Sequence, residues 1–61
     1  MPLIEVNILE GRTDEQKEAL LSAITRAVQE SINAPLDTIR IWINEMDPKH
    51  YMVAGRLKSK S

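Results

Sequence analysis

The chain opens with an alternation of apolar and polar residues over residues 2–9. The branched side chains share one face and the polar side chains share the other: Ile4, Val6 and Ile8 against Glu5 and Asn7. A period of two with branched side chains is typical of a β-strand that buries one face. Gly11 ends the pattern, because glycine adopts the backbone angles that a sharp exit requires. Residues 2–9 are therefore predicted to form the first strand.

The next pattern, over residues 14–32, repeats apolar residues at spacings of three and four. Its apolar stripe consists of Leu20, Ala23, Ile24, Ala27, Val28 and Ile32. That spacing predicts an amphipathic helix of about five turns, with charged residues such as Lys17 on its solvent face. Thr13 and Gln16 match a capping box, in which each side chain bonds the backbone N–H of the other residue. Asn33 favours the left-handed conformation in which helices often end.

Alternation returns over residues 38–45. The side chains divide into an isoleucine face and a mixed face: Ile39, Ile41 and Ile43 against Arg40 and Trp42. Strand, helix and strand predict a βαβ unit with parallel strands and a right-handed crossover. Residues 47–48 (Asp-Pro) signal a turn, and the segment that follows, with Gly55, predicts a short hairpin before a frayed tail at 58–61. The expected fold class is α+β.

The chain length allows one domain over residues 1–61 and only a thin core. There is no cysteine, so disulfides and thiolate metal sites are excluded. The single histidine, His50, cannot build a zinc site without other ligands. Association into an oligomer is then the remaining way to stabilise so small a fold. The mixed sheet face favours the same conclusion, because Trp42 has nothing in the chain to cover it.

The net charge of −1 arises from eight basic and nine acidic residues. This balance argues against nucleic acid or an anionic membrane as the main partner. No apolar run approaches the roughly 20 residues of a membrane span, and the N-terminus lacks a signal-peptide pattern. We therefore expect a cytoplasmic protein that binds neither nucleic acid nor membrane.

Pro2 is the first candidate for chemistry. Initiator methionine is usually removed when the next residue is small, and removal of Met1 would leave a free prolyl amine. In a pocket that is poor in water or near cations, the pKa of such an amine falls, and the amine becomes an effective base. The alternative is structural, because proline also suits the first position of a strand. Taken alone, Pro2 fits the structural role better.

Arg12 and Arg40 are the other candidates. Arg12 lies in the predicted strand-to-helix loop, and Arg40 projects from the uncovered sheet face. Guanidinium groups bind carboxylates through paired hydrogen bonds and stabilise an oxygen that gains negative charge. The alternatives are a solvated loop charge for Arg12 and an interface ion pair for Arg40, with Glu5 or Glu45 as its partner.

Taken together, these residues form a specific pattern. Pro2 opens a strand, Ile-Leu-Glu-Gly-Arg at 8–12 runs into Thr-Asp-Glu-Gln-Lys at 13–17, and Ile-Arg-Ile follows at 39–41. The pattern resembles 4-oxalocrotonate tautomerase from Pro2 to about Leu57, with almost no gaps. The resemblance implies the tautomerase fold, a homohexamer with sites built from several chains, and no metal or cofactor.

The resemblance also implies an isomerase for 1,3-keto–enol proton transfer on a 2-hydroxy-dienoate dicarboxylate such as 2-hydroxymuconate, in bacterial degradation of aromatic compounds. Pro2 aligns with the proline that takes the proton from the 2-hydroxyl and delivers it to carbon. Arg40 aligns with the arginine that holds one carboxylate and the 2-oxygen, and Arg12 with the one that binds the distal carboxylate. Leu9 aligns with a backbone amide that contacts the substrate oxygen. Tyr51 aligns with an aromatic wall of the pocket.

Three features depart from the family pattern. Tyr51 replaces a phenylalanine, so its hydroxyl makes the expected wall more polar. Trp42 is bulkier than the aliphatic residue expected there, and residues 52–56 contain fewer glycines. In addition, while Met1 is attached, the Pro2 nitrogen is an amide and has no basic lone pair.

Two other functions fit part of the pattern. A hydratase-type relative, such as a haloacrylate dehalogenase or a 3-oxo acid decarboxylase, would use the same proline on a 3-haloacrylate or a 3-oxo acid in place of the expected dicarboxylate or 2-oxo acid. Such enzymes usually need a further acidic residue to activate water, and no candidate is evident. A non-catalytic oligomerising module would keep the βαβ assembly but would tolerate replacement of Pro2, Arg12 and Arg40.

Overall fold

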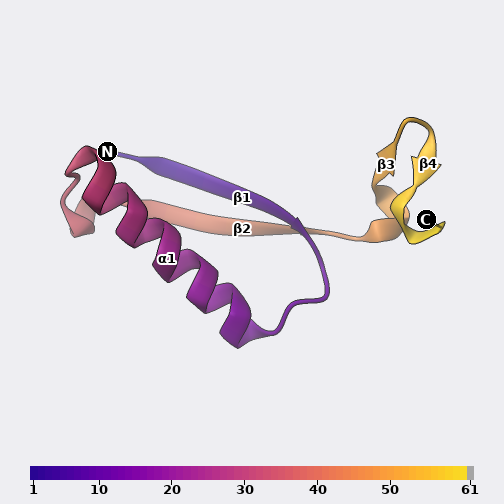
Figure 1. Ribbon diagram of the computed structural model, residues 1–61, viewed down its shortest axis with the longest axis horizontal. Helices are drawn as coiled ribbons and strands as arrows, with labels where there is room; N and C mark the ends of the chain where they lie inside the picture. The colour runs from indigo at the N-terminus through magenta and orange to yellow at the C-terminus, as the bar shows by residue number, and fades with distance from the viewer. Residues whose placement is uncertain (61) are drawn as a thin grey trace.

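The computed structural model describes residues 1–60, which form one βαβ unit followed by a small hairpin (Figure 1). The helix and the strands are β1 (Leu3–Leu9), α1 (Asp14–Ile32), β2 (Arg40–Met46), β3 (Met52–Val53) and β4 (Arg56–Leu57). Short 3-10 helices occupy Leu36–Thr38, Pro48–His50 and Lys58–Lys60. β1 and β2 pair in parallel, whereas β3 and β4 pair antiparallel. The expected α+β fold class, with parallel strands and a C-terminal hairpin, is confirmed.

β2 begins two residues later than the sequence pattern indicated. Residues 36–38 form a 3-10 turn, in which the Thr38 N–H and hydroxyl both donate to the Pro35 carbonyl, at 3.0 and 2.7 Å. Thr38 therefore belongs to the connection, and the prediction of a strand from residue 38 is wrong. Pairing with β1 starts where Leu3 lies opposite Arg40.

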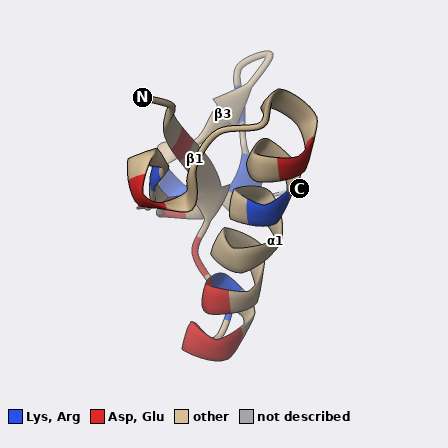
Figure 2. Ribbon diagram, turned by 90° about the vertical axis from the view of Figure 1, so that its left-hand side faces the viewer, with Lys and Arg blue, Asp and Glu red and all other residues tan. Residues whose placement is uncertain are grey.

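Both ends of α1 follow local signals in the sequence. The Thr13 hydroxyl accepts a hydrogen bond from the Gln16 N–H at 3.1 Å, and the Gln16 side chain accepts one from the Thr13 N–H at 3.0 Å. This capping box satisfies N–H groups that have no partner within the helix. Acidic residues gather at the same end (Figure 2), where the helix dipole favours negative charge. Asn33 closes the helix with a φ of 56°, as predicted.

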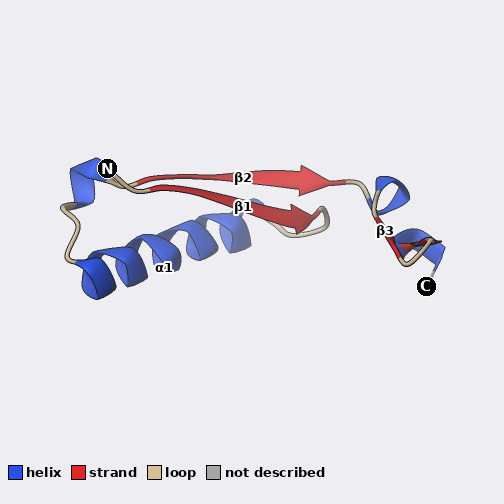
Figure 3. Ribbon diagram, turned by 90° about the horizontal axis from the view of Figure 1, so that it is seen from above, coloured by secondary structure: helices blue, strands red, loops and turns tan. Residues whose placement is uncertain are grey.

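The helix lies along one face of the β1–β2 sheet, and the opposite face is uncovered within residues 1–60 (Figure 3). The core between the two layers is thin. Ile39 is the one apolar side chain of the described residues that counts as buried, at 8% exposed. Ala23, Ala27 and Ile32 are exposed, so the inward stripe of the helix is narrower than predicted. Two strands cover only part of the apolar surface that the helix presents.

The hairpin of β3 and β4 projects beyond the end of β2 (Figure 1). Its turn has Ala54 at φ 52° and Gly55 at φ 81°, the left-handed pair that a two-residue hairpin turn requires. Glycine takes this conformation without steric cost, whereas an alanine in it costs about 1–2 kcal/mol. The turn thus carries this cost at Ala54 and avoids it at Gly55, and it forms with one glycine in the segment.

The tail differs from the expected fraying. Residues 58–60 form a 3-10 turn, and the Lys58 N–H donates to the Tyr51 carbonyl at 2.9 Å. This bond returns the chain to the base of the hairpin. Ser61, the last residue of the predicted tail, lies outside the described residues.

The chain is unusually extended for its length. Its principal extents are 42 × 24 × 14 Å and its radius of gyration is 14.5 Å, whereas a compact chain of this length has a radius of about 10.5 Å. Its accessible surface is 4859 Å², roughly 850 Å² more than expected for a compact monomer of this size. That surface includes large apolar side chains: Leu3, Ile32, Leu36, Trp42, Met52 and Val53. Within residues 1–60, no helix is both long enough and apolar enough to cross a bilayer.

Candidate active site

Parallel pairing of the strands brings Pro2 and Arg40 together at one end of the sheet. Leu3 lies opposite Arg40, and the Arg40 N–H donates to the Pro2 carbonyl at 3.1 Å. Pro2 is half-buried, and Arg40 is exposed. Pro2, just before β1, and Arg40, the first residue of β2, are therefore backbone neighbours at this end of the sheet.

The Arg40 guanidinium keeps most of its hydrogen-bonding capacity. Its Nη1 donates to the Asp37 carbonyl at 2.6 Å, and a guanidinium has five N–H donors in all. Within residues 1–60 it has no carboxylate partner, and Glu5 and Glu45, which the sequence offered as partners, bond to other side chains. The Asp37 carbonyl therefore holds one N–H of the Arg40 guanidinium, and the other N–H groups remain able to bind an anion.

Leu9 and Arg12 lie at the opposite end of the sheet, where the chain leaves β1 for α1. The Glu10 N–H donates to the Met46 carbonyl at 2.9 Å. Because successive N–H groups of a strand point to opposite sides, the Leu9 N–H points away from β2, toward the open edge of β1. The Arg12 side chain lines a hollow of about 290 Å³, and among the described residues it has no hydrogen bond or ion pair. Both groups are available to a ligand.

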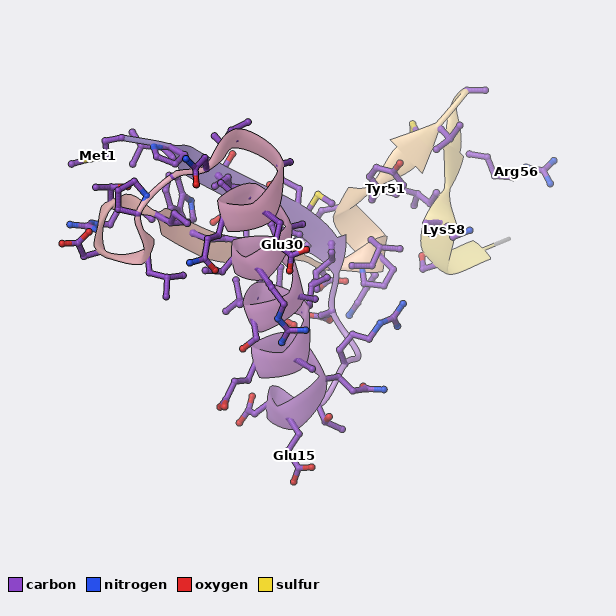
Figure 4. The ribbon with its side chains drawn as sticks, turned by 60° about the vertical axis from the view of Figure 1, so that its left-hand side comes forward. Met1, Glu15, Glu30, Tyr51, Arg56 and Lys58 are labelled. Atoms are coloured by element: carbon purple, nitrogen blue, oxygen red, sulfur yellow. The ribbon has the colours of Figure 1, made fainter. Side chains whose placement is uncertain are left out.

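Tyr51 lies in the hairpin arm, residues 47–60 beyond β2, away from the Pro2–Arg40 end and the Leu9–Arg12 end of the sheet. Its side chain is 37% exposed, and its N–H reaches the Pro48 carbonyl at 3.5 Å. Figure 4 shows Tyr51 and Met1 on separate parts of the chain, with Tyr51 at the base of the projecting hairpin. Within a single chain, Tyr51 therefore does not wall a pocket around Pro2.

The length of β1 separates the predicted site residues into groups. A strand rises about 3.3 Å per residue, so the ends of this seven-residue strand lie roughly 20 Å apart. A small dicarboxylate cannot contact Pro2 and Arg12 of the same chain across that span. The fold joins Pro2 to Arg40 and Leu9 to Arg12, and it leaves Tyr51 apart. A site that uses all five residues needs more than one chain.

The uncovered sheet face carries a polar cluster that sequence reasoning missed. The Glu5 Oε2 accepts hydrogen bonds from the Trp42 Nε1 at 3.1 Å and from the Asn44 Nδ2 at 2.6 Å. Trp42 lies directly opposite Glu5 in the strand register and is 42% exposed. Alternation in the two strands puts all three residues on one face, but only the register shows that they are neighbours. The cluster fixes the indole ring on that face.

A second missed contact joins α1 to β2. The Lys17 Nζ lies 2.9 Å from the Glu45 Oε1 and 3.4 Å from the Asp14 Oδ1. The hydrogen bond to Glu45 raises the pKa of Lys17 above its ordinary value; burial opposes this rise, and Asp14 adds to it. Lys17 is half-buried, so its predicted place on the solvent face is wrong. A long lysine stem can cover apolar surface while its ammonium group reaches a carboxylate.

Comparisons with known proteins agree with this architecture. The family model for tautomerase enzymes matches residues 2–61. A 2-hydroxymuconate tautomerase of Pseudomonas putida is 45% identical over 60 residues, which cover 98% of this chain and 95% of that protein. The crystal structure of YwhB, a homologue of 4-oxalocrotonate tautomerase, has a TM-score of 0.94 at 45% identity over 98% of both chains. A heterohexamer 4-oxalocrotonate tautomerase from Chloroflexus aurantiacus has a TM-score of 0.93 at 35% identity, covering 98% of this chain and 97% of that one.

The fold and these matches define an isomerase built from a single βαβ unit and a hairpin. The chain belongs to the tautomerase family, and its homologues are 4-oxalocrotonate and 2-hydroxymuconate tautomerases. The resemblance seen in the sequence is therefore confirmed. The same matches favour an enzyme over a non-catalytic oligomerising module.

Proposed function

We propose that this tautomerase transfers a proton on 2-hydroxy-dienoates such as 2-hydroxymuconate, with the free amine of Pro2 as the base. The observation that carries the proposal is the pairing of Pro2 with Arg40 at the same end of the sheet. The P. putida relative supports the substrate class, since it is named for 2-hydroxymuconate. The expected setting, cytoplasmic degradation of aromatic compounds, stays a prediction from the resemblance.

The reaction needs one group that both removes and returns a proton. The Pro2 nitrogen takes the proton from the 2-hydroxyl, and the oxygen electrons form the carbonyl as the double bonds shift along the chain. The same protonated amine then delivers the proton to carbon, so atoms and charge balance without an added reagent. A secondary amine in a pocket that disfavours its charged form suits both steps.

The two arginines would hold the two ends of the substrate. Arg40, next to Pro2, binds one carboxylate and the 2-oxygen and stabilises negative charge on that oxygen. Arg12 binds the distal carboxylate, and the Leu9 N–H contacts the substrate oxygen. Tyr51 would form part of the pocket wall from another chain.

Assembly would bring these groups together. The β1 edge opposite β2 is open, and antiparallel pairing of two such edges would set Pro2 of one chain beside Leu9 and Arg12 of the next. The chain's excess surface, roughly 850 Å², matches the area that one partner buries in a stable interface. The C. aurantiacus relative is a heterohexamer, and we propose a homohexamer here.

Removal of Met1 is required for this chemistry. Met1 is 80% exposed, so the bond before Pro2 is open to an aminopeptidase. While Met1 is attached, the Pro2 nitrogen belongs to a peptide bond and is not basic.

The test is the ketonisation of 2-hydroxymuconate by the wild type and by Pro2→Ala. Loss of the ring amine is expected to lower kcat by about 10²–10⁴-fold, the usual contribution of a positioned base. Lys49→Met, a change in an exposed side chain of the hairpin arm, should retain full activity. Full activity in Pro2→Ala would reject proline as the base, and halide release from 3-chloroacrylate at a higher rate would favour the hydratase-type enzyme.

A further inference from the structure

The loop that carries Arg12 is anchored on both sides. On the β1 side, the Glu10 N–H bonds the Met46 carbonyl at 2.9 Å. On the α1 side, the capping box fixes Thr13, and the Lys17 N–H bonds the Thr13 carbonyl at 3.0 Å. Arg12 lies between these anchors with a free side chain. Its position is therefore set by how the start of α1 is held against the sheet.

The Lys17–Glu45 ion pair links that start to the sheet. Glu45 continues the isoleucine face of β2 toward the helix and lies opposite Ile8 in the register. Its Oε1 meets the Lys17 Nζ at 2.9 Å, with Lys17 only 22% exposed and Glu45 34% exposed. Among the described residues, no other side-chain hydrogen bond or ion pair links α1 to β2. The pair thus links the two layers at this end.

The same pair also decides which cation in the hollow is free. The hollow is lined by Ile8, Arg12, Gln16, Lys17 and Leu20. The Lys17 ammonium is neutralised by Glu45 and, more weakly, by exposed Asp14. Arg12 therefore remains the one cation of this hollow without a carboxylate among residues 1–60.

We propose that Lys17 and Glu45 are positioning residues that place Arg12 for the distal carboxylate and thereby make the enzyme selective for dicarboxylate substrates. This inference rests on the proposed role of Arg12. It assigns Lys17 and Glu45 no contact with the reacting atoms. Their effect is confined to the end of the substrate that lies farthest from Pro2.

The readout is the ratio of kcat/KM for 2-hydroxymuconate to kcat/KM for 2-hydroxypenta-2,4-dienoate, which lacks the distal carboxylate. Both values come from one sample, so any loss of folded enzyme cancels in the ratio. Lys17→Met and Glu45→Gln should each lower the ratio by about fivefold, a usual coupling within one ion-pair network. Lys17→Arg, which keeps a cation for Glu45, should leave the ratio close to that of the wild type. Lys49→Met and Glu30→Gln are the matched controls, since both side chains are exposed and far along the chain from the hollow.

Combining Arg12→Ala with Lys17→Met separates the proposed role of Arg12 from the positioning role of Lys17 and Glu45. If Arg12 binds the distal carboxylate, Arg12→Ala alone lowers the ratio, and Lys17→Met then has no further effect on it. A ratio that falls in Arg12→Ala but stays at the wild-type value in Lys17→Met and Glu45→Gln overturns the positioning role. A ratio unchanged in Arg12→Ala rejects the proposed role of Arg12 itself. Lowering of the ratio by Lys17→Met in the absence of Arg12 would contradict action through Arg12.

Discussion

The two ends of the β1–β2 sheet hold their candidate residues in different ways. At the amino end, strand pairing alone places Pro2 beside Arg40, whose side chain bonds only the Asp37 carbonyl within residues 1–60. At the carboxyl end, Arg12 sits on a loop held by a backbone bond, a capping box and the Lys17–Glu45 pair. This difference fits the proposed roles, in which Pro2 and Arg40 serve the reaction and Arg12 binds a remote carboxylate.

The largest effect should come from the amino end. Arg40→Ala is expected to lower kcat by about 10²–10³-fold, because it removes the proposed donor to the 2-oxygen, where negative charge develops. The loss should be similar for the dicarboxylate and the monocarboxylate substrate, since both carry that oxygen. Steady-state kinetics on both substrates check this. A loss confined to the dicarboxylate would show that Arg40 acts in recognition, and the contrast between the two ends would fail.

The next effect should come from the carboxyl end. Arg12→Ala is expected to raise KM for 2-hydroxymuconate by about 10–100-fold, as for loss of a charge-assisted hydrogen bond. The kinetics of the monocarboxylate substrate should stay close to those of the wild type. Equal losses on both substrates would mean that Arg12 also serves the reacting end.

The smallest expected effect is on the pH dependence of stability, through the Lys17–Glu45 pair. The pKa of Lys17 is raised in the folded chain, chiefly by its hydrogen bond to Glu45. The stability that this pair contributes is therefore fully present below the unfolded lysine pKa of about 10.4 and is lost as pH rises through the higher folded value. Thermal unfolding of the wild type and Lys17→Met should differ at pH 8 and converge in strong alkali. A difference that persists there would assign the effect to the lysine stem.

The sequence predicted the parts of the fold that local patterns determine. Thr13, Gln16 and Asn33 gave both ends of the helix, and alternation gave both strands, because these signals act between residues that are close in the chain. Lys17 was misplaced because periodicity treats any charge as solvent-facing, whereas its stem lies over the sheet and its ammonium meets Glu45. The 3-10 turn at residues 36–38 also shortened a predicted strand, because Thr38 bonds Pro35 locally.

The sequence supplies candidate site residues, whose roles stay predictions, but it does not supply their geometry. Family motifs identified Pro2, Arg12 and Arg40, but only the register shows that Pro2 and Arg40 are neighbours. The length of β1, roughly 20 Å, then separates the end of the sheet that leads to Arg12 from the end that carries both of them. Tyr51 lies on the hairpin arm, away from Pro2 within the chain, so its expected place in the pocket wall stays a prediction from the family pattern.

The central claim, that a free Pro2 amine is the base, is tested most directly by following Met1. Protein that retains Met1 would be treated with a methionine aminopeptidase, and its intact mass and its rate of 2-hydroxymuconate ketonisation measured in the same samples. We predict that activity rises in proportion to the fraction of chains that begin at Pro2. Full activity while Met1 is still attached would contradict the account.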